Sequence, residues 1–188
     1  LWWAAHHRIH HQTSDSAADV HSPDQGGFWW AHVGWVLSND YDEYDPRLIQ
    51  DFSRFAELRW LDRHFLVPPA LLAVVILAFG GLPLFLWGFV ISTVVLFHGT
   101  FAINSLAHVW GTRSFDTPDQ SRNNFLLAVI TLGEGWHNNH HRYMHACRQG
   151  LRWWEIDVTY YVLRALHALG IVREIRPVRL PYEARQQV

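Results

Sequence analysis

Histidine is the residue type in this sequence most able to support chemistry. Fourteen histidines occur among 188 residues, and six of them form two copies of one spacing, i, i+3 and i+4. The two copies comprise His7, His10, His11, His137, His140 and His141. On a helix, residues three and four apart share one face. Each copy is therefore expected to present three imidazoles to a common centre. A third element, Asn104 and His108, again has i, i+4 spacing.

The number of imidazoles indicates which metal site they could form. Imidazole binds iron, zinc, copper and nickel. A mononuclear zinc site needs only three or four protein ligands, so the six histidines together with His108 indicate either two metal ions or a heavily redundant set of ligands. Soluble di-iron bundles rely mainly on carboxylates. The sequence therefore predicts a different, histidine-rich class of di-metal site.

One long apolar stretch must position these elements. Residues 65–112 contain no Asp, Glu, Lys or Arg. As a single helix they would extend roughly 70 Å at about 1.5 Å per residue, although a bilayer core is only about 30 Å thick. Gly80-Gly81-Leu82-Pro83 is a strong turn signal inside the stretch. We therefore expect two helices, 65–79 and 83–107, forming a transmembrane hairpin at 65–107. The alternative is a buried hairpin in a soluble protein.

The charges at the two ends of the hairpin predict its orientation. Arg54, Arg59 and Arg63 precede it, Arg113 and Arg122 follow it, and the turn is uncharged. Basic residues favour the cytoplasmic side, so both ends should be cytoplasmic and the turn external. Histidines that flank the hairpin would then meet on one side of the membrane.

The remaining sequence completes an all-α prediction. We expect an interrupted helix from Phe125 to His145, an amphipathic helix over Leu151–Leu169 and an extended tail containing Pro177 and Pro181. The result is an integral membrane helical protein whose cytoplasmic helical cap holds the histidines. A net charge of −2 without a basic block gives no sign of nucleic-acid binding, and a single cysteine excludes an internal disulfide.

Two groups of residues have weaker assignments. Carboxylates near the clusters could orient metal-bound rings by accepting their outer N–H; the candidates are Asp15, Asp19, Glu134 and Asp157. Histidines outside the two copies are expected to be structural or surface residues: His6, His21, His32, His64, His98, His145 and His167.

These motifs together resemble one family. The segments HRIHH (7–11), NSLAH (104–108) and GEGWHNNHH (133–141) resemble the boxes of the acyl-CoA Δ9, or stearoyl-CoA type, fatty acid desaturases. The segments GFWWAHVGW (27–35) and SRNN (121–124) are also similar to that family. The resemblance covers nearly the whole chain and implies a membrane-bound enzyme with two Fe ions that uses O2 and two electrons to form a cis double bond near Δ9.

The resemblance also assigns residues. The implied iron ligands are His7, His10, His11, His108, His137, His140 and His141. Asn104 matches a position that reaches a metal through water, and Trp3 and Thr100 match positions that line the acyl tunnel. The family has a further His-x-x-x-x-His box on an earlier membrane hairpin. We therefore expect residues 1–188 to be an N-terminally truncated fragment of a single desaturase domain.

The resemblance further implies partners and location. The expected substrate is a fatty acyl thioester, with CoA preferred, or an acyl lipid, because Ala5 stands where animal members carry a basic residue that meets CoA. The electron donor would be cytochrome b5, ferredoxin or rubredoxin with its reductase. The implied location is a membrane of the bacterial inner-membrane or endoplasmic-reticulum type, with the metal site cytoplasmic.

Two alternatives share part of the pattern. Membrane di-iron hydroxylases of alkanes or carotenoids also have histidine boxes, and the product, alkene or alcohol, distinguishes them. A membrane metal-binding or transport protein would place polar residues through the span, but only Ser92, Thr93, His98 and Thr100 lie there. Oxygen consumption coupled to a reductant would exclude this second alternative.

Overall fold

A computed structural model describes residues 1–178, and these residues form helices and loops without a β-strand. The all-α prediction is thereby confirmed for the described residues. The N-terminal half contains α1 (Trp2–Thr13), α2 (Pro23–Gly26), η1 (Trp30–Gly34), α3 (Trp35–Leu37), η2 (Asn39–Tyr41), η3 (Pro46–Ile49), α4 (Gln50–Ser53) and α5 (Ala56–Arg63). The rest contains α6 (Val67–Phe85), η4 (Leu86–Ile91), α7 (Ser92–Asn104), α8 (Leu106–Val109), α9 (Phe125–Ile130), α10 (His137–Arg142) and α11 (Val158–Ala168). Pro181 of the expected extended tail lies outside the described residues.

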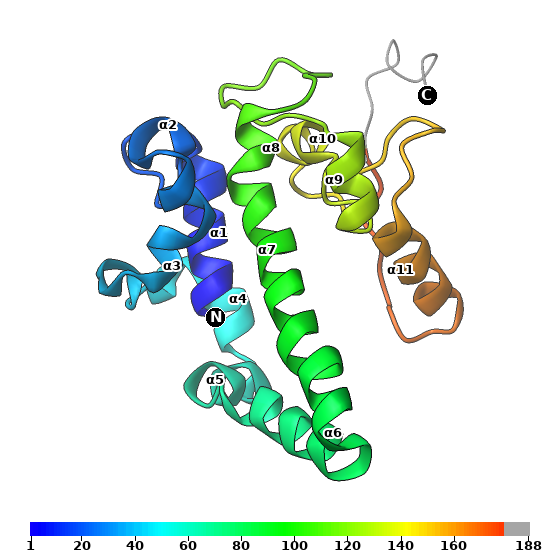
Figure 1. The fold of residues 1–188 in the computed structure, drawn as a ribbon. Coiled ribbons are helices and arrows are strands. Elements are labelled where there is room, and N and C mark those ends of the chain that lie inside the picture. Colours follow the sequence, from blue (N-terminus) through cyan, green and yellow to red (C-terminus); the bar gives the residue numbers. More distant parts are fainter. Residues whose placement is uncertain (179–188) are drawn as a thin grey trace.

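The apolar stretch forms a helical segment of 43 residues from Val67 to Val109, and an 18-residue window within it has a mean hydropathy of 2.4. Its backbone leaves helical geometry at Gly81, where φ is 63° and ψ is −172°. Glycine adopts this left-handed conformation without the steric cost that other residues incur. The bend therefore falls inside the predicted turn signal, and helix resumes at once on its far side (Figure 1). That the two arms cross a bilayer as a hairpin stays a prediction.

The side chains of this segment are not covered by the rest of the described chain. No residue is buried in the 18-residue window that identifies the span. Phe79 is 90% exposed and Leu96 is 67% exposed. Exposed apolar surface of this extent is unfavourable in water. The segment is thus not the buried core helix that the soluble alternative requires.

The buried part of the molecule gathers at the end of α7 opposite the bend. Figure 1 shows α1 beside the upper half of α7, with α8, α9 and α10 grouped at the same end. Of the side chains buried here, more are polar than apolar. Buried polar groups are costly unless they are hydrogen-bonded, so this end must be organised by specific polar contacts.

Two asparagines anchor the short helix α10. The Asn138 side-chain oxygen accepts hydrogen bonds from the backbone N–H groups of Ser114 and Phe115, both at 2.8 Å. The Asn139 side-chain nitrogen donates to Glu155 at 2.8 Å, and its oxygen accepts from Asn123 at 2.7 Å. A helix of six residues is not stable by itself. These amides replace the stability that its length cannot provide.

The interrupted helix expected from Phe125 to His145 is two helices, α9 and α10. The tight connection includes Leu132 at φ 59° and Gly133 at φ 129°. The expected amphipathic helix over Leu151–Leu169 begins only at Val158, because Asp157 caps it by accepting from the Tyr160 N–H at 2.9 Å. The interruption between Phe125 and His145 is as predicted, whereas the expected start at Leu151 was wrong, because the Asp157 side chain caps the start of α11.

Gly135 provides a test of the α9–α10 connection. A Cβ at this position would lie 2.6 Å from the Ala128 Cα, and backbone cannot move aside as a flexible side chain can. We expect Gly135→Ala to lower the free energy of unfolding by about 1–3 kcal/mol, the usual cost of overpacking. Gly99→Ala is the control, since its Cβ would make only an ordinary 4.0 Å contact with Thr131. Equal thermal midpoints for the two variants in detergent would contradict the assigned packing.

Candidate metal centre

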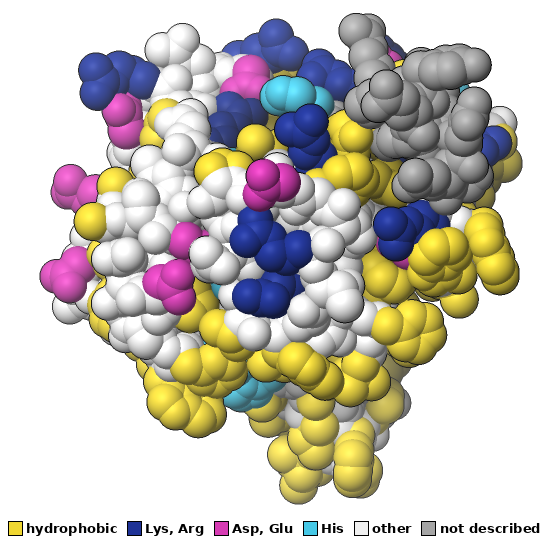
Figure 2. Space-filling view, turned by 90° about the horizontal axis from the view of Figure 1, so that it is seen from above, with side chains coloured by type: hydrophobic (Ala, Val, Ile, Leu, Met, Phe, Trp, Pro, Cys, Tyr) yellow, Lys and Arg dark blue, Asp and Glu magenta, His cyan; other side chains and the backbone are white. Residues whose placement is uncertain are grey.

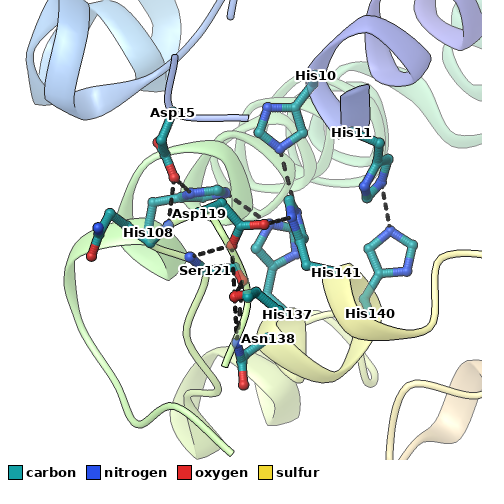
Figure 3. A network of polar contacts seen from close by, with 12 residues as sticks. His10, His11, Asp15, His108, Asp119, Ser121, His137, Asn138, His140 and His141 are labelled. Carbon is teal, nitrogen blue, oxygen red and sulfur yellow. Dashed lines mark hydrogen bonds and ion pairs between the residues drawn. The ribbon is translucent and has the colours of Figure 1, made fainter. Parts of the chain in front are cut away.

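Three helices bring all seven predicted histidines to one place. His7, His10 and His11 come from α1, His108 comes from α8, and His137, His140 and His141 come from α10. Figure 3 shows rings from the three helices converging. Their side-chain nitrogens form two groups, and within each group the atoms lie within 4.8 Å of one another. A role as metal ligands remains the prediction made from their spacing.

The first group contains four buried histidines: His10, His108, His137 and His141. The Nε2 atoms of His108 and His137 are 3.0 Å apart, and those of His10 and His141 are 3.4 Å apart. The second group contains three half-buried histidines: His7, His11 and His140. The His11 Nε2 lies 3.0 Å from that of His7 and 2.9 Å from that of His140.

The grouping exchanges one histidine between the two copies of the motif. In each copy the i and i+4 residues stay together, as His7 with His11 and His137 with His141. The i+3 residue of each copy, His10 or His140, joins the pair from the other helix. Each copy was expected to present its three imidazoles together to a common centre. The structure instead builds each centre from both helices, which ties α1 to α10.

Carboxylates hold the outer nitrogens of three rings in the four-histidine group. The Nδ1 of His10 is 3.0 Å from Asp19, that of His108 is 2.8 Å from Asp15, and that of His141 is 3.0 Å from Asp119. Ionised carboxylates only accept hydrogen bonds, so each Nδ1 carries the proton and each Nε2 keeps a free lone pair. This is the usual arrangement around metal-bound histidine.

Two of the four proposed carboxylates have this position and two do not. Asp157 accepts from the backbone N–H groups of Gln149 and Gly150 instead. Glu134 makes no side-chain hydrogen bond to the described residues, although it borders the site. Sequence reasoning missed Asp119, because it lies in an irregular segment far from either motif; its only signal is the turn in which it accepts from the Ser121 N–H at 2.9 Å.

His21 also belongs to this region, although it was assigned a structural or surface role. It is buried, and its ring centroid lies 4.2 Å from that of His10. His10, Asp19 and His21 form a further group of possible ligand atoms. The short Asp19-Val20-His21 spacing was the only sequence signal for this position.

Burial sets the protonation of the cluster. Desolvation lowers the pKa of His7 to about 4 and that of His140 to about 3. Burial and neighbouring histidines also lower the pKa values of His10 and His137. Burial opposes ionisation of Asp15, but His108 and the Gln120 N–H outweigh it and bring the pKa of Asp15 down to about 2. Near neutral pH these imidazoles are neutral, which is the form that binds a metal.

The residues present fit the two iron ions that the motifs imply. Each group offers at least three neutral imidazole nitrogens, and imidazole is a suitable ligand for iron. Asn104 is buried and its side-chain nitrogen has no hydrogen-bond partner among the described residues. It borders a cavity of about 240 Å³ together with His7, His137 and His140. An unpaired buried amide facing this cluster is consistent with a polar ligand there.

An apolar cavity of about 580 Å³ lies next to the cluster. Trp3 and Thr100 border both this cavity and the smaller one beside the histidines. The Trp3 ring also stacks on His7, with centroids 6.0 Å apart. The Thr100 hydroxyl donates to the Leu96 carbonyl on the same helix at 3.2 Å. That hydrogen bond accounts for the hydroxyl group without any contact to a substrate. Substrate contact by these two residues stays a prediction.

Comparison with known proteins identifies the family. The family description "Fatty acid desaturase" matches residues 1–185. The chain belongs to the fatty acid desaturase family. An icosanoyl-CoA 5-desaturase of Limnanthes douglasii is 44% identical over 98% of this chain and 52% of its own length. The resemblance inferred from the three histidine boxes is therefore confirmed.

Relatives within the family act on two kinds of acyl carrier, according to their names. An sn-2 palmitoyl-lipid 9-desaturase of Nostoc is 40% identical, over 93% of this chain and 63% of its own length. An sn-1 stearoyl-lipid 9-desaturase of Synechocystis is 37% identical, over 93% of this chain and 55% of its own length. The chain spans about half to two thirds of the length of these desaturases.

The outer carboxylates can be tested through metal affinity. Asp119→Asn keeps the shape of the side chain but gives a weaker acceptor for the His141 N–H, so that ring is less firmly oriented. We expect iron affinity to fall by about 10- to 100-fold. Asp116→Asn is the matched control, because Asp116 lies in the same segment, is fully exposed and is 3.7 Å from its nearest cation, Arg113. Equal iron content after dialysis of both variants would contradict the role of Asp119.

The lowered histidine pKa values predict acid sensitivity of the metal-free protein. The unfolded chain binds protons at the ordinary pKa of 6.5, whereas His7 in the fold has a pKa of about 4. Stability is therefore full above pH 6.5 and decreases as the pH falls from 6.5 towards 4. Thermal unfolding in detergent across this range measures the loss, and His7→Phe should make it shallower. A flat profile would contradict the burial of neutral imidazoles.

Proposed function

We propose that the protein containing this chain carries out O2-dependent desaturation of a saturated fatty acyl chain at a histidine-ligated di-iron centre. The observation that carries the proposal is the pair of imidazole groups beside an apolar cavity. An acyl chain has no polar group that a protein could hydrogen-bond, so only the shape of an apolar cavity can position it. Family membership adds independent support. The substrate is an acyl-CoA or an acyl lipid, and the motifs favour a cis double bond at Δ9.

The side chains described here have separable tasks in that reaction. Bound iron would supply O2 activation and hydrogen abstraction, which no protein side chain can perform. The imidazoles hold the ions, and Asp15, Asp19 and Asp119 orient three of the rings. The apolar cavity would take the acyl tail. Trp3 and Thr100 border both cavities, where the reacting part of the chain would pass.

The overall reaction fixes the partners. A saturated acyl chain, O2, two electrons and two protons give an alkene and two waters. The electrons come from a one-electron carrier such as cytochrome b5, ferredoxin or rubredoxin, supplied by its reductase. Because the acyl chain and its product are membrane lipids or are released into the membrane, a bilayer location suits both.

The placement in the membrane follows from charge. We place the apolar part of the segment Val67–Val109 in the bilayer and the histidine-rich end on the cytoplasmic side. Figure 2 looks onto that end and shows basic side chains near its centre, with hydrophobic ones around much of the margin. Arg113 and Arg122 follow the span directly. Basic residues at the membrane edge favour the cytoplasm, which supports this orientation.

Loss of one imidazole from the three-histidine group tests the function. In the full-length, iron-loaded protein with an electron donor, we expect alkene formation from saturated acyl substrates. His140→Ala should reduce it by more than about 100-fold, because losing a ligand costs more than losing a residue that only orients one. His145→Ala, exposed and outside both groups, should keep the activity.

The products decide between the proposal and its alternatives. An alcohol in place of an alkene would establish the hydroxylase reaction instead. Unchanged substrate with full iron, donor and O2 would refute both reactions. Full activity of His140→Ala would show that the imidazole groups are not the reaction centre.

A further inference from the structure

A second cluster of histidines lies outside the candidate metal centre. His32 on η1 and His98 on α7 contact each other, with the His32 Nε2 2.9 Å from the His98 Nδ1. The His32 Nδ1 lies 2.9 Å from the hydroxyl of Ser105. These residues connect η1 to α7 through side chains alone. An ionisable residue within a membrane span usually has a function, and His98 lies within the span.

The hydrogen bonds of Ser105 determine which nitrogens of His32 and His98 carry a proton. The Ser105 hydroxyl donates to the Phe101 carbonyl at 2.9 Å, so its oxygen accepts the proton of the His32 Nδ1. A neutral imidazole with its proton on Nδ1 has an acceptor at Nε2, and His98 must therefore donate from its Nδ1. Phe28 stacks on His32 with an interplanar angle of 10° and stops that ring from turning. The orientation of the His98 ring is thus fixed, and its Nε2 remains an unprotonated polar atom.

His98 is a polar residue in a cavity that is otherwise almost entirely apolar. The other residues around the apolar cavity, apart from Thr100, are hydrophobic: Trp2, Trp3, Val33, Val36, Leu37, Val94, Leu96, Phe97 and Phe101. His98 lies six residues before Asn104 on α7, which is about 9 Å along the helix axis towards the bend. The polar head of an acyl substrate stays at the cap, so the tail beyond the reacting carbons points towards His98.

We infer that His98 is a specificity-determining residue that limits how far an acyl tail extends into the cavity, and that His32 is the positioning residue that holds it there. The inference rests on the proposed function. The His98 Nε2 keeps an unpaired lone pair, and methylenes placed against it offer no hydrogen bond, which is unfavourable. Tails that end before His98 avoid this cost, whereas longer tails must cover the ring or displace it from His32.

The first experiment compares two chain lengths in the full-length, iron-loaded protein. A mixture of a palmitoyl and a stearoyl substrate is supplied on the same carrier, and the ratio of the two alkenes is measured. His98→Leu removes the polar ring, so the ratio of stearoyl to palmitoyl product should rise about tenfold, the scale on which apolar pockets discriminate small differences in length. His98→Met is a second variant in case the branched side chain of His98→Leu disturbs folding. Its flexible side chain adapts to the available space, and it should shift the product ratio in the same direction.

The second experiment distinguishes the positioning role of His32 from the role of His98 in lining the cavity. His32 does not line the cavity, so His32→Phe alters the cavity by freeing the His98 ring, and the iron content reports any effect of its lost contact with Ser105. We expect a smaller shift in the same direction, and no further shift when His32→Phe is added to His98→Leu, because the two residues act as one unit. Ser92→Ala is the control, being a polar-to-apolar change on the same helix but outside the cavity.

Iron content and direct binding of each saturated substrate without an electron donor are measured in parallel. Absence of alkene from the unaltered protein would refute the proposed function rather than this inference. If the unaltered protein makes alkene, a product ratio within about twofold of its value in the His98 variants overturns the inference. Loss of iron in those variants also overturns it, because the residues would then support the metal centre and not chain length.

Discussion

The pairing of buried imidazoles with carboxylates is the constraint on which the cap depends. Neutral rings in a water-poor interior need a partner for the outer N–H, and Asp15, Asp19 and Asp119 provide it from irregular backbone. Asp15 adopts φ 59°, a left-handed conformation that Asp tolerates better than most residues. From there its carboxylate also accepts from the Gln120 N–H at 2.7 Å and the Ser22 hydroxyl at 2.9 Å. One side chain thus joins three segments far apart in the sequence.

The same constraint explains why such short helices persist. Helices α8 and α10 contain four and six residues, too few for stability by length. Asn138 and Asn139 connect α10 to two loops, and His108 fastens α8 to Asp15. Polar contacts therefore replace the apolar packing that holds most small domains together.

The sequence predicted which histidines would meet but not how they would divide. Residues i and i+4 differ by about 40° around a helix, whereas i+3 lies about 60° to the other side. Three such imidazoles span an arc wide enough to serve two centres, and the partner helix decides the division. Asp119 could not be predicted, because it has no periodic relation to His141 and reaches it only through tertiary folding. The apolar stretch and its break at Gly81, in contrast, follow from composition and one turn signal.

The two imidazole groups are held unequally by their outer contacts. All three carboxylate contacts serve the buried four-histidine group. In the three-histidine group, the Nδ1 atoms of His11 and His140 have no partner among the described residues. Rings without an outer anchor can adjust at smaller cost than anchored ones. The three-histidine group is half-buried, and its members His7 and His140 border the cavity shared with Trp3 and Thr100, as does His137, the one ring of the four-histidine group without a carboxylate contact. The rings along this cavity are therefore the ones that lack a carboxylate anchor, so the cavity side of the cluster is its more adjustable side.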